Sequence, residues 1–106
     1  MKATRLIPLT LTLAIGLLLT TGQAAADEAT AKANGCMACH ALDKKLVGPA
    51  YKSVANKYKG DAAAADRLAK EIRTGSKGVW GPVPMPAQAK ISDADLKKVL
   101  AWVLAQ

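Results

Sequence analysis

The chain contains few of the residues that build large cores and metal clusters. Its 106 residues include no phenylalanine, two tyrosines, two tryptophans, two cysteines and one histidine. Two cysteines and one histidine fall short of the four ligands that a structural zinc site usually needs, which argues against such a site. A domain of this size rarely obtains more than about 3 to 5 kcal/mol from a side-chain core alone. A large apolar cofactor would supply the missing interior, and we predict that the chain is largely unfolded without one.

Strand-like alternation of apolar and polar residues is absent from the sequence, as is any internal repeat. Apolar residues recur instead at helical spacing in three stretches. An Ala-rich stretch precedes them and begins near Asp27 and Glu28, where acidic side chains suit the positive end of a helix dipole. The three apolar stripes are Tyr51, Val54, Ala55 and Tyr58; Ala65, Leu68, Ala69 and Ile72; and Leu96, Val99, Leu100 and Val103. The sequence therefore predicts an all-α fold of about four helices.

Residues that start and stop helices support these segments. The expected boundaries are Pro49 in the first turn of the second helix, Gly60-Asp61 before the third, Gly75 after the third, and Ser92 with Asp95 as a capping box at the fourth. Because these signals agree with the apolar stripes, the helical prediction does not rest on periodicity alone.

The N-terminus has neither a twin-arginine pair nor a long apolar run. Basic residues precede an apolar run of 14 residues from Leu6 to Leu19, and small residues follow as far as Ala26. This order is typical of a secretory signal peptide, so we predict residues 1–26 as a cleaved signal peptide and 27–106 as the mature domain. The run is short for a membrane span of about 20 residues, and a retained anchor is the less favoured alternative. General secretion of an unfolded chain would place the domain in the periplasm.

The most informative stretch is Cys36-Met37-Ala38-Cys39-His40. Cys-x-x-Cys-His is the sequence that attaches haem covalently in c-type cytochromes. On a helical turn, residues three apart lie on one face, so both thiols can meet the two vinyl groups of one haem edge while His40 turns under the iron. The alternatives are a zinc half-site, a plain disulfide, or a thioredoxin-like thiol pair, which would need a βαβ scaffold.

An irregular, proline-rich segment from Ser76 to Lys90 carries the candidate for a second iron ligand. Met85 lies between two prolines, which fix the backbone on both sides and bias Met85 toward an extended conformation. Met1 would leave with the signal peptide, and Met37 is too constrained inside the attachment motif to reach the other haem face. Given haem on His40, we predict Met85 as the sixth ligand. Ligation by Met and His fills both axial positions and raises the reduction potential, which suits an electron carrier.

Four blocks in this order make the chain similar to small bacterial class I cytochromes c, of the cytochrome c-five-fifty-one (cytochrome c-eight) family. The blocks are residues 35–40, 47–51, 78–86 and 101–104, and they span essentially the whole mature segment. The resemblance implies a small class I cytochrome c fold, in which about four helices wrap around one haem c.

The resemblance also implies roles for two further cofactor-binding residues. The carbonyl of Pro49 would accept a hydrogen bond from the His40 ring, which fixes the tautomer and strengthens the ligand. Trp80 would point its indole N–H at a haem propionate, and simple packing is the alternative for this residue. Pro49 can serve as a helix-start residue at the same time.

The chain departs from the family pattern at two places. Ala87 and Gln88 follow Pro-Met-Pro where relatives often have Pro and Asn, so Gln88 is the polar side chain left to support Met85. Glu71 stands where several relatives place a basic residue near a propionate. That propionate would then lose a cationic partner, its pKa would rise, and the midpoint potential would depend on pH near neutrality.

The expected function is that of a monomeric periplasmic one-electron carrier rather than an enzyme. The resemblance implies a membrane quinol-oxidising cytochrome complex as donor and a nitrite reductase, cytochrome oxidase or peroxidase as acceptor, all through transient contacts. The mature segment has 13 basic and 8 acidic residues, but no aromatic residues interleave with the basic ones, which gives nucleic acid binding little support. The alternative is a haem sensor or peroxidase-like enzyme in which Met85 is displaceable.

Five lysines either ring the exposed haem edge and steer acidic partners or form an ordinary solvated face. They are Lys44, Lys45, Lys52, Lys57 and Lys59.

Overall fold

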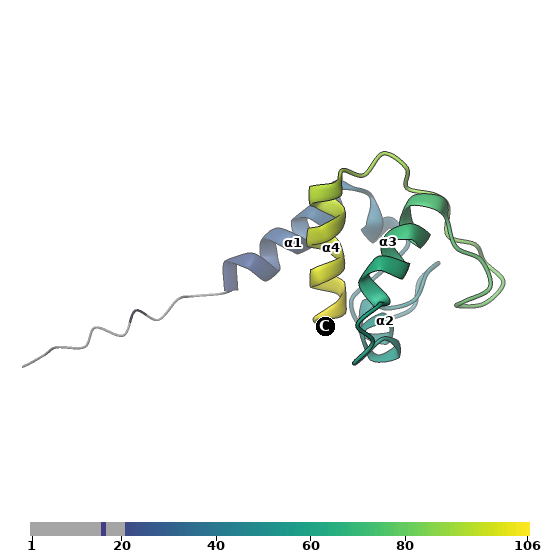
Figure 1. The fold of residues 1–106 in the computed structure, drawn as a ribbon, viewed down its shortest axis with the longest axis horizontal. Helices are drawn as coiled ribbons and strands as arrows, with labels where there is room; N and C mark the ends of the chain where they lie inside the picture. The colour runs from purple at the N-terminus through teal and green to yellow at the C-terminus, as the bar shows by residue number, and fades with distance from the viewer. Residues whose placement is uncertain (1–15, 17–20) are drawn as a thin grey trace, which may run out of the picture.

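Four α-helices and one 3₁₀ turn form the regular structure of Gly16 and residues 21–106, which this computed structural model describes. The elements are α1 (Thr21–Ala33), η1 (Cys36–Ala38), α2 (Tyr51–Lys57), α3 (Ala64–Thr74) and α4 (Asp93–Leu104). Figure 1 shows α4 crossing α1 on one side, with α2 and α3 on the other. The all-α prediction is confirmed, since the described residues contain four helices and a single isolated β-bridge.

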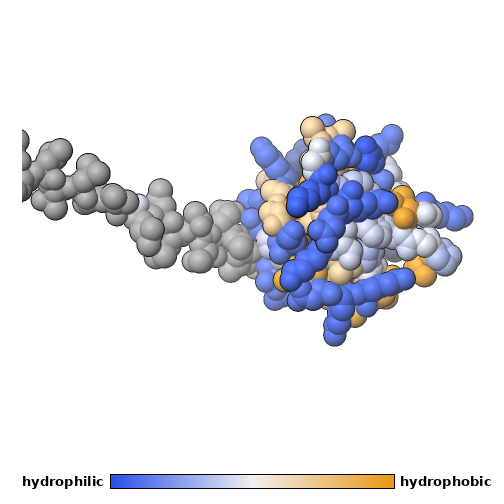
Figure 2. Space-filling model, turned by 90° about the horizontal axis from the view of Figure 1, so that it is seen from below, coloured by the Kyte–Doolittle hydropathy of each residue, from blue (hydrophilic) through white to orange (hydrophobic). Residues whose placement is uncertain are grey.

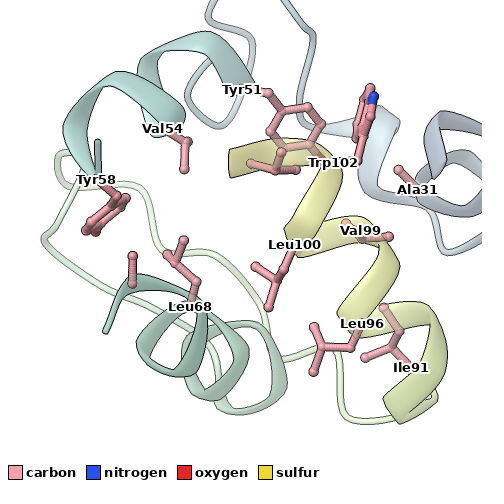
Figure 3. Close-up of a cluster of buried hydrophobic side chains, with 12 residues drawn as sticks. Ala31, Tyr51, Val54, Tyr58, Leu68, Ile91, Leu96, Val99, Leu100 and Trp102 are labelled. Atoms are coloured by element: carbon pink, nitrogen blue, oxygen red, sulfur yellow. The ribbon is translucent and has the colours of Figure 1, made fainter. Parts of the chain in front are cut away.

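The core is organised around α4, which contacts each of the other three α-helices. Its predicted stripe is buried, as is the stripe on α2. Figure 3 shows Leu96, Val99 and Leu100 of α4 facing the side chains of the other helices, with Trp102 beside Tyr51 and Ala31. The face seen in Figure 2 is mostly hydrophilic, with hydrophobic residues in separate spots. Because the helices pack on this apolar interior, the segments that connect them begin and end at fixed places.

The apolar stripe of α3 differs from the predicted one by one residue. Ala65 is exposed, whereas Ala64 is 1% exposed and joins Leu68 in the core. The helix begins at Ala64, and residues four apart lie on one face of a helix, so Ala64 and Leu68 share the buried face with Ile72. Gly75 ends the helix with φ +88°, as predicted.

At the start of α4, one of the two hydrogen bonds of the predicted capping box is present. The Ser92 side chain accepts a hydrogen bond from the Asp95 N–H at 3.1 Å, and Ile91 and Leu96 are both buried on either side of this turn. The Asp95 carboxylate accepts a 3.2 Å hydrogen bond from the Asn34 side chain, 61 positions earlier in the chain. Asp95 therefore joins the end of α1 to the start of α4.

Two predicted helix starts are wrong. α1 begins at Thr21 rather than at Asp27, because the Ala-rich residues before Asp27 contain no proline and continue the same helix. α2 begins at Tyr51 after the N-cap residue Ala50, so Pro49 precedes the first turn. The Pro49 carbonyl meets His40 instead, which keeps the backbone extended up to Ala50.

The predicted signal peptide falls mostly on residues 1–15 and 17–20, which lie outside the described part of the chain. Cleavage after Ala26 stays a prediction. In the part of the chain that is described, no helix combines the length and the apolarity that a membrane crossing requires.

Candidate cofactor site

The attachment motif forms one tight turn directly after α1. Gly35 adopts a left-handed conformation, with φ +75°, and redirects the chain from α1 into η1. The N–H groups of Cys39 and His40 both bond to the carbonyl of Cys36, at 3.3 and 3.1 Å. Both cysteines are free and half-buried. One short turn thus presents two thiols and an imidazole.

Burial raises the pKa of the Cys36 thiol, and the hydroxyl of Tyr51, hydrogen-bonded to it, partly opposes this. The pKa of Tyr51 is also raised, first by its own burial and then by the charge that a Cys36 thiolate would carry. The thiolate is the reactive form of cysteine.

The His40 ring is held on several sides. Its Nδ1 lies 2.8 Å from the carbonyl oxygen of Pro49, and its ring stacks on Tyr51 with centroids 4.9 Å apart and planes at 14°. Tyr51 in turn meets the edge of Trp102, at 5.4 Å and 76°. A carbonyl can only accept, so Nδ1 must carry the proton, and Nε2 of the neutral ring keeps a lone pair for a metal.

Gly48 allows the backbone to pass directly against this ring. A Cβ at Gly48 would lie 2.5 Å from Cε1 of His40 and 2.9 Å from each ring nitrogen. The N–H of Gly48 bonds to the Cys39 carbonyl at 2.8 Å, which fixes the close approach. Gly48 is not among the predicted site residues, although it lies in the block of residues 47–51. The only available signal was a glycine directly before Pro49.

Residues 77–91 form the segment that carries Met85, and we refer to them as the methionine arm. Ser76 and Met85 exchange two backbone hydrogen bonds, of 3.1 and 2.8 Å, in an antiparallel bridge. This pairing agrees with the extended conformation expected at Met85. The N–H of Gln88 bonds to the carbonyl of Ile72 in α3 at 2.7 Å. The arm is therefore attached to the end of α3 through its backbone.

One cavity brings the six predicted site residues together: Cys36, Cys39, His40, Pro49, Trp80 and Met85 all line it. Its free space, including the open mouth, is about 1290 Å³. Apolar side chains from all three helices α2, α3 and α4 complete the wall: Val54, Leu68, Ile72, Val99, Leu100 and Val103. A mainly apolar cavity with a few convergent polar groups suits a large, mainly apolar cofactor.

Glu71 and Gln88, at which the chain departs from the family pattern, also line the cavity. Burial, and after it the charge of Glu71, raise the pKa of Tyr58. The Gln88 side chain donates a 3.2 Å hydrogen bond to the Pro86 carbonyl, which holds the arm locally.

Trp80 is half-buried and faces a cation. The Lys57 ammonium lies 5.3 Å from the centroid of the Trp80 ring and 5.9 Å from that of Tyr58. Lys57 thus brings positive charge to the cavity wall that Glu71 shares. Lys52, another of the five lysines considered for the exposed haem edge, forms an ion pair with Asp43.

A comparison with known families decides the class of this site. The family model described as cytochrome c matches residues 22–106. The chain belongs to the cytochrome c family. This membership implies one covalently bound haem c and an electron-carrier protein, and the two free thiols, the imidazole and the large apolar cavity fit that group.

Named relatives agree with the family match. Cytochrome c-551 of Pseudomonas aeruginosa is 53% identical over 95 residues, which cover 89% of this chain and 90% of that protein. Cytochrome c-552 of Nitrosomonas europaea is 48% identical over 93 residues, covering 88% and 90%. The crystal structure of wild-type Nitrosomonas europaea cytochrome c552 superposes with a TM-score of 0.71 at 47% identity, covering 74% of this chain and 96% of that one. These likenesses confirm the predicted resemblance and the class I cytochrome fold.

Proposed function

We propose that this protein is a periplasmic one-electron carrier in which Cys36 and Cys39 hold haem c and in which His40 and Met85 bind its iron. The observation that carries the proposal is that all four side chains line one cavity, although Met85 is distant from the motif in sequence. Haem c supplies the ferric/ferrous couple when bound. The chain's own residues orient the ligands and exclude water.

The surroundings of His40, namely Gly48, Pro49 and Tyr51, form the histidine side of the cavity and favour a fixed ligand of high basicity. The hydrogen bond from Nδ1 to the Pro49 carbonyl sets the tautomer and increases the electron density at Nε2. Tyr51 stacks on one face of the ring, and the backbone of Gly48 passes against it. A ring held this way changes little between two oxidation states of a metal.

The methionine side supports a high reduction potential. A thioether ligand favours ferrous over ferric iron, and low polarity around a haem disfavours the more positive ferric state. The aliphatic side chains that line the cavity provide that surrounding. If His40 and Met85 both bound the iron, small molecules would find no free coordination site, which favours a carrier over an enzyme.

The rim of the cavity supports docking by transient contacts. Val47, Val79 and Val83 line the cavity and are 57%, 41% and 59% exposed, and the neighbouring Leu46 is 43% exposed. Lys44 and Lys45 precede this rim and are exposed. Small apolar contacts with flanking positive charge suit brief redox encounters with acidic partners. The proposed donor is a quinol-oxidising cytochrome complex, and the proposed acceptor is a nitrite reductase, cytochrome oxidase or peroxidase.

Periplasmic export is proposed from the signal-peptide pattern of residues 1–26. The predicted mature segment contains 80 of the 106 residues, about 75% of the chain. The solved Nitrosomonas europaea structure is matched by 74% of this chain over 96% of its own length. The two shares are similar, which supports a haem-binding unit of about this length.

Optical spectra of the purified protein, oxidised and reduced, test the proposal. We expect a c-type haem spectrum and, in the oxidised protein, the weak charge-transfer band of a methionine bound to iron. Reduced protein should not bind carbon monoxide at neutral pH. Carbon monoxide binding, or an oxidised protein without the band, would contradict ligation by Met85 and favour the sensor or enzyme. Free thiols titrating in the purified protein would contradict attachment through Cys36 and Cys39.

A further inference from the structure

We infer that Arg73, in the last turn of α3, is a positioning residue for Met85 because it fastens the far end of the methionine arm. The inference rests on the proposed ligation of iron by His40 and Met85. Arg73 lines no part of the cavity wall and would act only through the arm.

The arm is held to the end of α3 and the residues after it at three points. Two of them use backbone atoms alone: the bridge between Ser76 and Met85, and the bond from the Gln88 N–H to the Ile72 carbonyl. At the third point the Arg73 guanidinium donates a 3.0 Å hydrogen bond to the carbonyl of Ile91. In residues 27–106, this is the one hydrogen bond in which a side chain of α3 reaches the arm. Of these three attachments, only the one at Arg73 depends on a side chain.

The end that Arg73 holds is also an end of the cavity. Ile91 is 7% exposed, belongs to the core and lines the cavity. Its carbonyl lies directly before Ser92, the N-cap residue of α4. If Arg73 is lost, this half-buried carbonyl loses a charged donor, and the arm loses one of its three attachments. Met85, six residues away, can then leave a metal more readily.

Of the two contacts of Arg73, the one with the carbonyl should dominate. Arg73 also pairs with Asp93 in the first turn of α4, but the Asp93 side chain is 99% exposed. Exposed ion pairs contribute little because water and salt screen them. The hydrogen bond to Ile91 joins a charged donor to a partly buried acceptor and is the stronger kind. Removing the Asp93 carboxylate alone should therefore leave Met85 in place.

The test uses the haem-loaded protein and imidazole, which competes with the methionine for oxidised iron. Arg73→Met removes the donors but keeps an apolar stem, and we expect about fivefold tighter imidazole binding and a methionine-to-iron band lost at lower temperature. Arg73→Lys keeps one donor within reach of the carbonyl and should restore most of the wild-type affinity. Asp93→Asn should change the affinity by less than about twofold.

Arg67→Met is the matched control. Arg67 also lies on α3 and also pairs with an aspartate, Asp61 at 3.2 Å, but it contacts Tyr58 rather than the arm. This variant should bind imidazole within about twofold of wild type even if its thermal stability falls by as much as that of Arg73→Met. Equal imidazole affinity in Arg73→Met and wild type, or an equal increase in both arginine variants, would overturn the inference. Absence of the methionine band in the wild-type protein would instead contradict the proposed ligation itself.

Discussion

The histidine side and the methionine side of the cavity are built differently. The His40 ring is touched directly by three neighbours close in sequence, namely Gly48, Pro49 and Tyr51. The methionine arm is held mainly through its backbone, and Val79 and Val83 within it are exposed. A ligand fixed through its own ring has little freedom, whereas a ligand on an arm moves when the arm moves. The difference predicts that the methionine side yields first under stress.

The largest expected effect comes from removing both attachment points. A Cys36→Ala/Cys39→Ala protein without haem would leave the cavity, which is lined largely by apolar side chains, without its filling. We expect it to be largely unfolded, because so small a side-chain core contributes only about 3 to 5 kcal/mol. Circular dichroism during heating measures this. A cooperative thermal transition would mean that both sides of the cavity form without the cofactor.

Removing the ligand on the weaker side should change redox behaviour without unfolding the protein. For Met85→Ala we expect loss of the methionine-to-iron band and a fall in midpoint potential on the order of 0.2 V, within the range of about 0.8 V that axial ligands span. Met37→Ala is the control, since Met37 is packed against the core within the attachment motif. A Met85→Ala protein with an unchanged potential would show that another group binds the iron.

Gly48→Ala tests the tightness of the histidine side. The new Cβ would collide with the His40 ring at 2.5 Å, so ring or backbone must shift. We expect the free energy of unfolding of the haem-loaded protein to fall by about 1 to 3 kcal/mol in denaturant titrations, with the methionine band retained.

Gly75→Ala is the counterpart on the other side. There a Cβ would lie 3.0 Å from the Met85 carbonyl oxygen, and φ is +88°. This variant should lose stability too, since a Cβ is strained at this φ, but it should also weaken the methionine band, which Gly48→Ala should not. A methionine band weakened equally in both variants would show that the two sides are not independent.

The midpoint potential should depend on pH between about 5 and 8. Glu71 lines the cavity at the position where several relatives place a basic residue, so a haem propionate there would lack a cationic partner and its pKa would rise. Deprotonation of this propionate adds negative charge near the iron and stabilises the ferric state, so the potential should fall as the pH rises. The expected fall is tens of millivolts, since about 59 mV corresponds to a tenfold change in the equilibrium constant of a one-electron couple. Glu71→Gln should flatten this dependence. Potentiometric titration at several pH values measures it, and a flat wild-type profile would remove the idea.

The smallest expected effect concerns Tyr58 at alkaline pH. Burial and the charge of Glu71 raise its pKa, so the folded state disfavours the ionised ring. The resulting stability is complete below the unfolded pKa of about 10 and is lost as the pH rises through the folded value. As the pH rises from neutral to above about 10, Tyr58→Phe should therefore lose less stability than the wild-type protein. Parallel losses in urea titrations would contradict this.

The sequence predicted the members of the site better than their supports. Met85 followed from elimination among three methionines, and burial on α4 followed from its apolar spacing. Arg73 gave no signal and Gly48 gave only its place before Pro49, because their importance lies in contacts with Ile91 and His40 that only the folded chain creates. The start of α2 was misplaced for the same reason: the Pro49 carbonyl serves His40, which local helix rules do not include.

The contact between Asn34 and Asp95 has a consequence for how the molecule folds. It joins residues 61 positions apart, and every residue proposed to hold haem, from Cys36 to Met85, lies between them. The site is therefore a long loop that docking of α1 on α4 closes. Loop closure costs entropy that grows slowly with loop length, and contacts so distant in sequence slow folding. We therefore expect the docking of α1 on α4 to be among the slow steps in the assembly of the pocket.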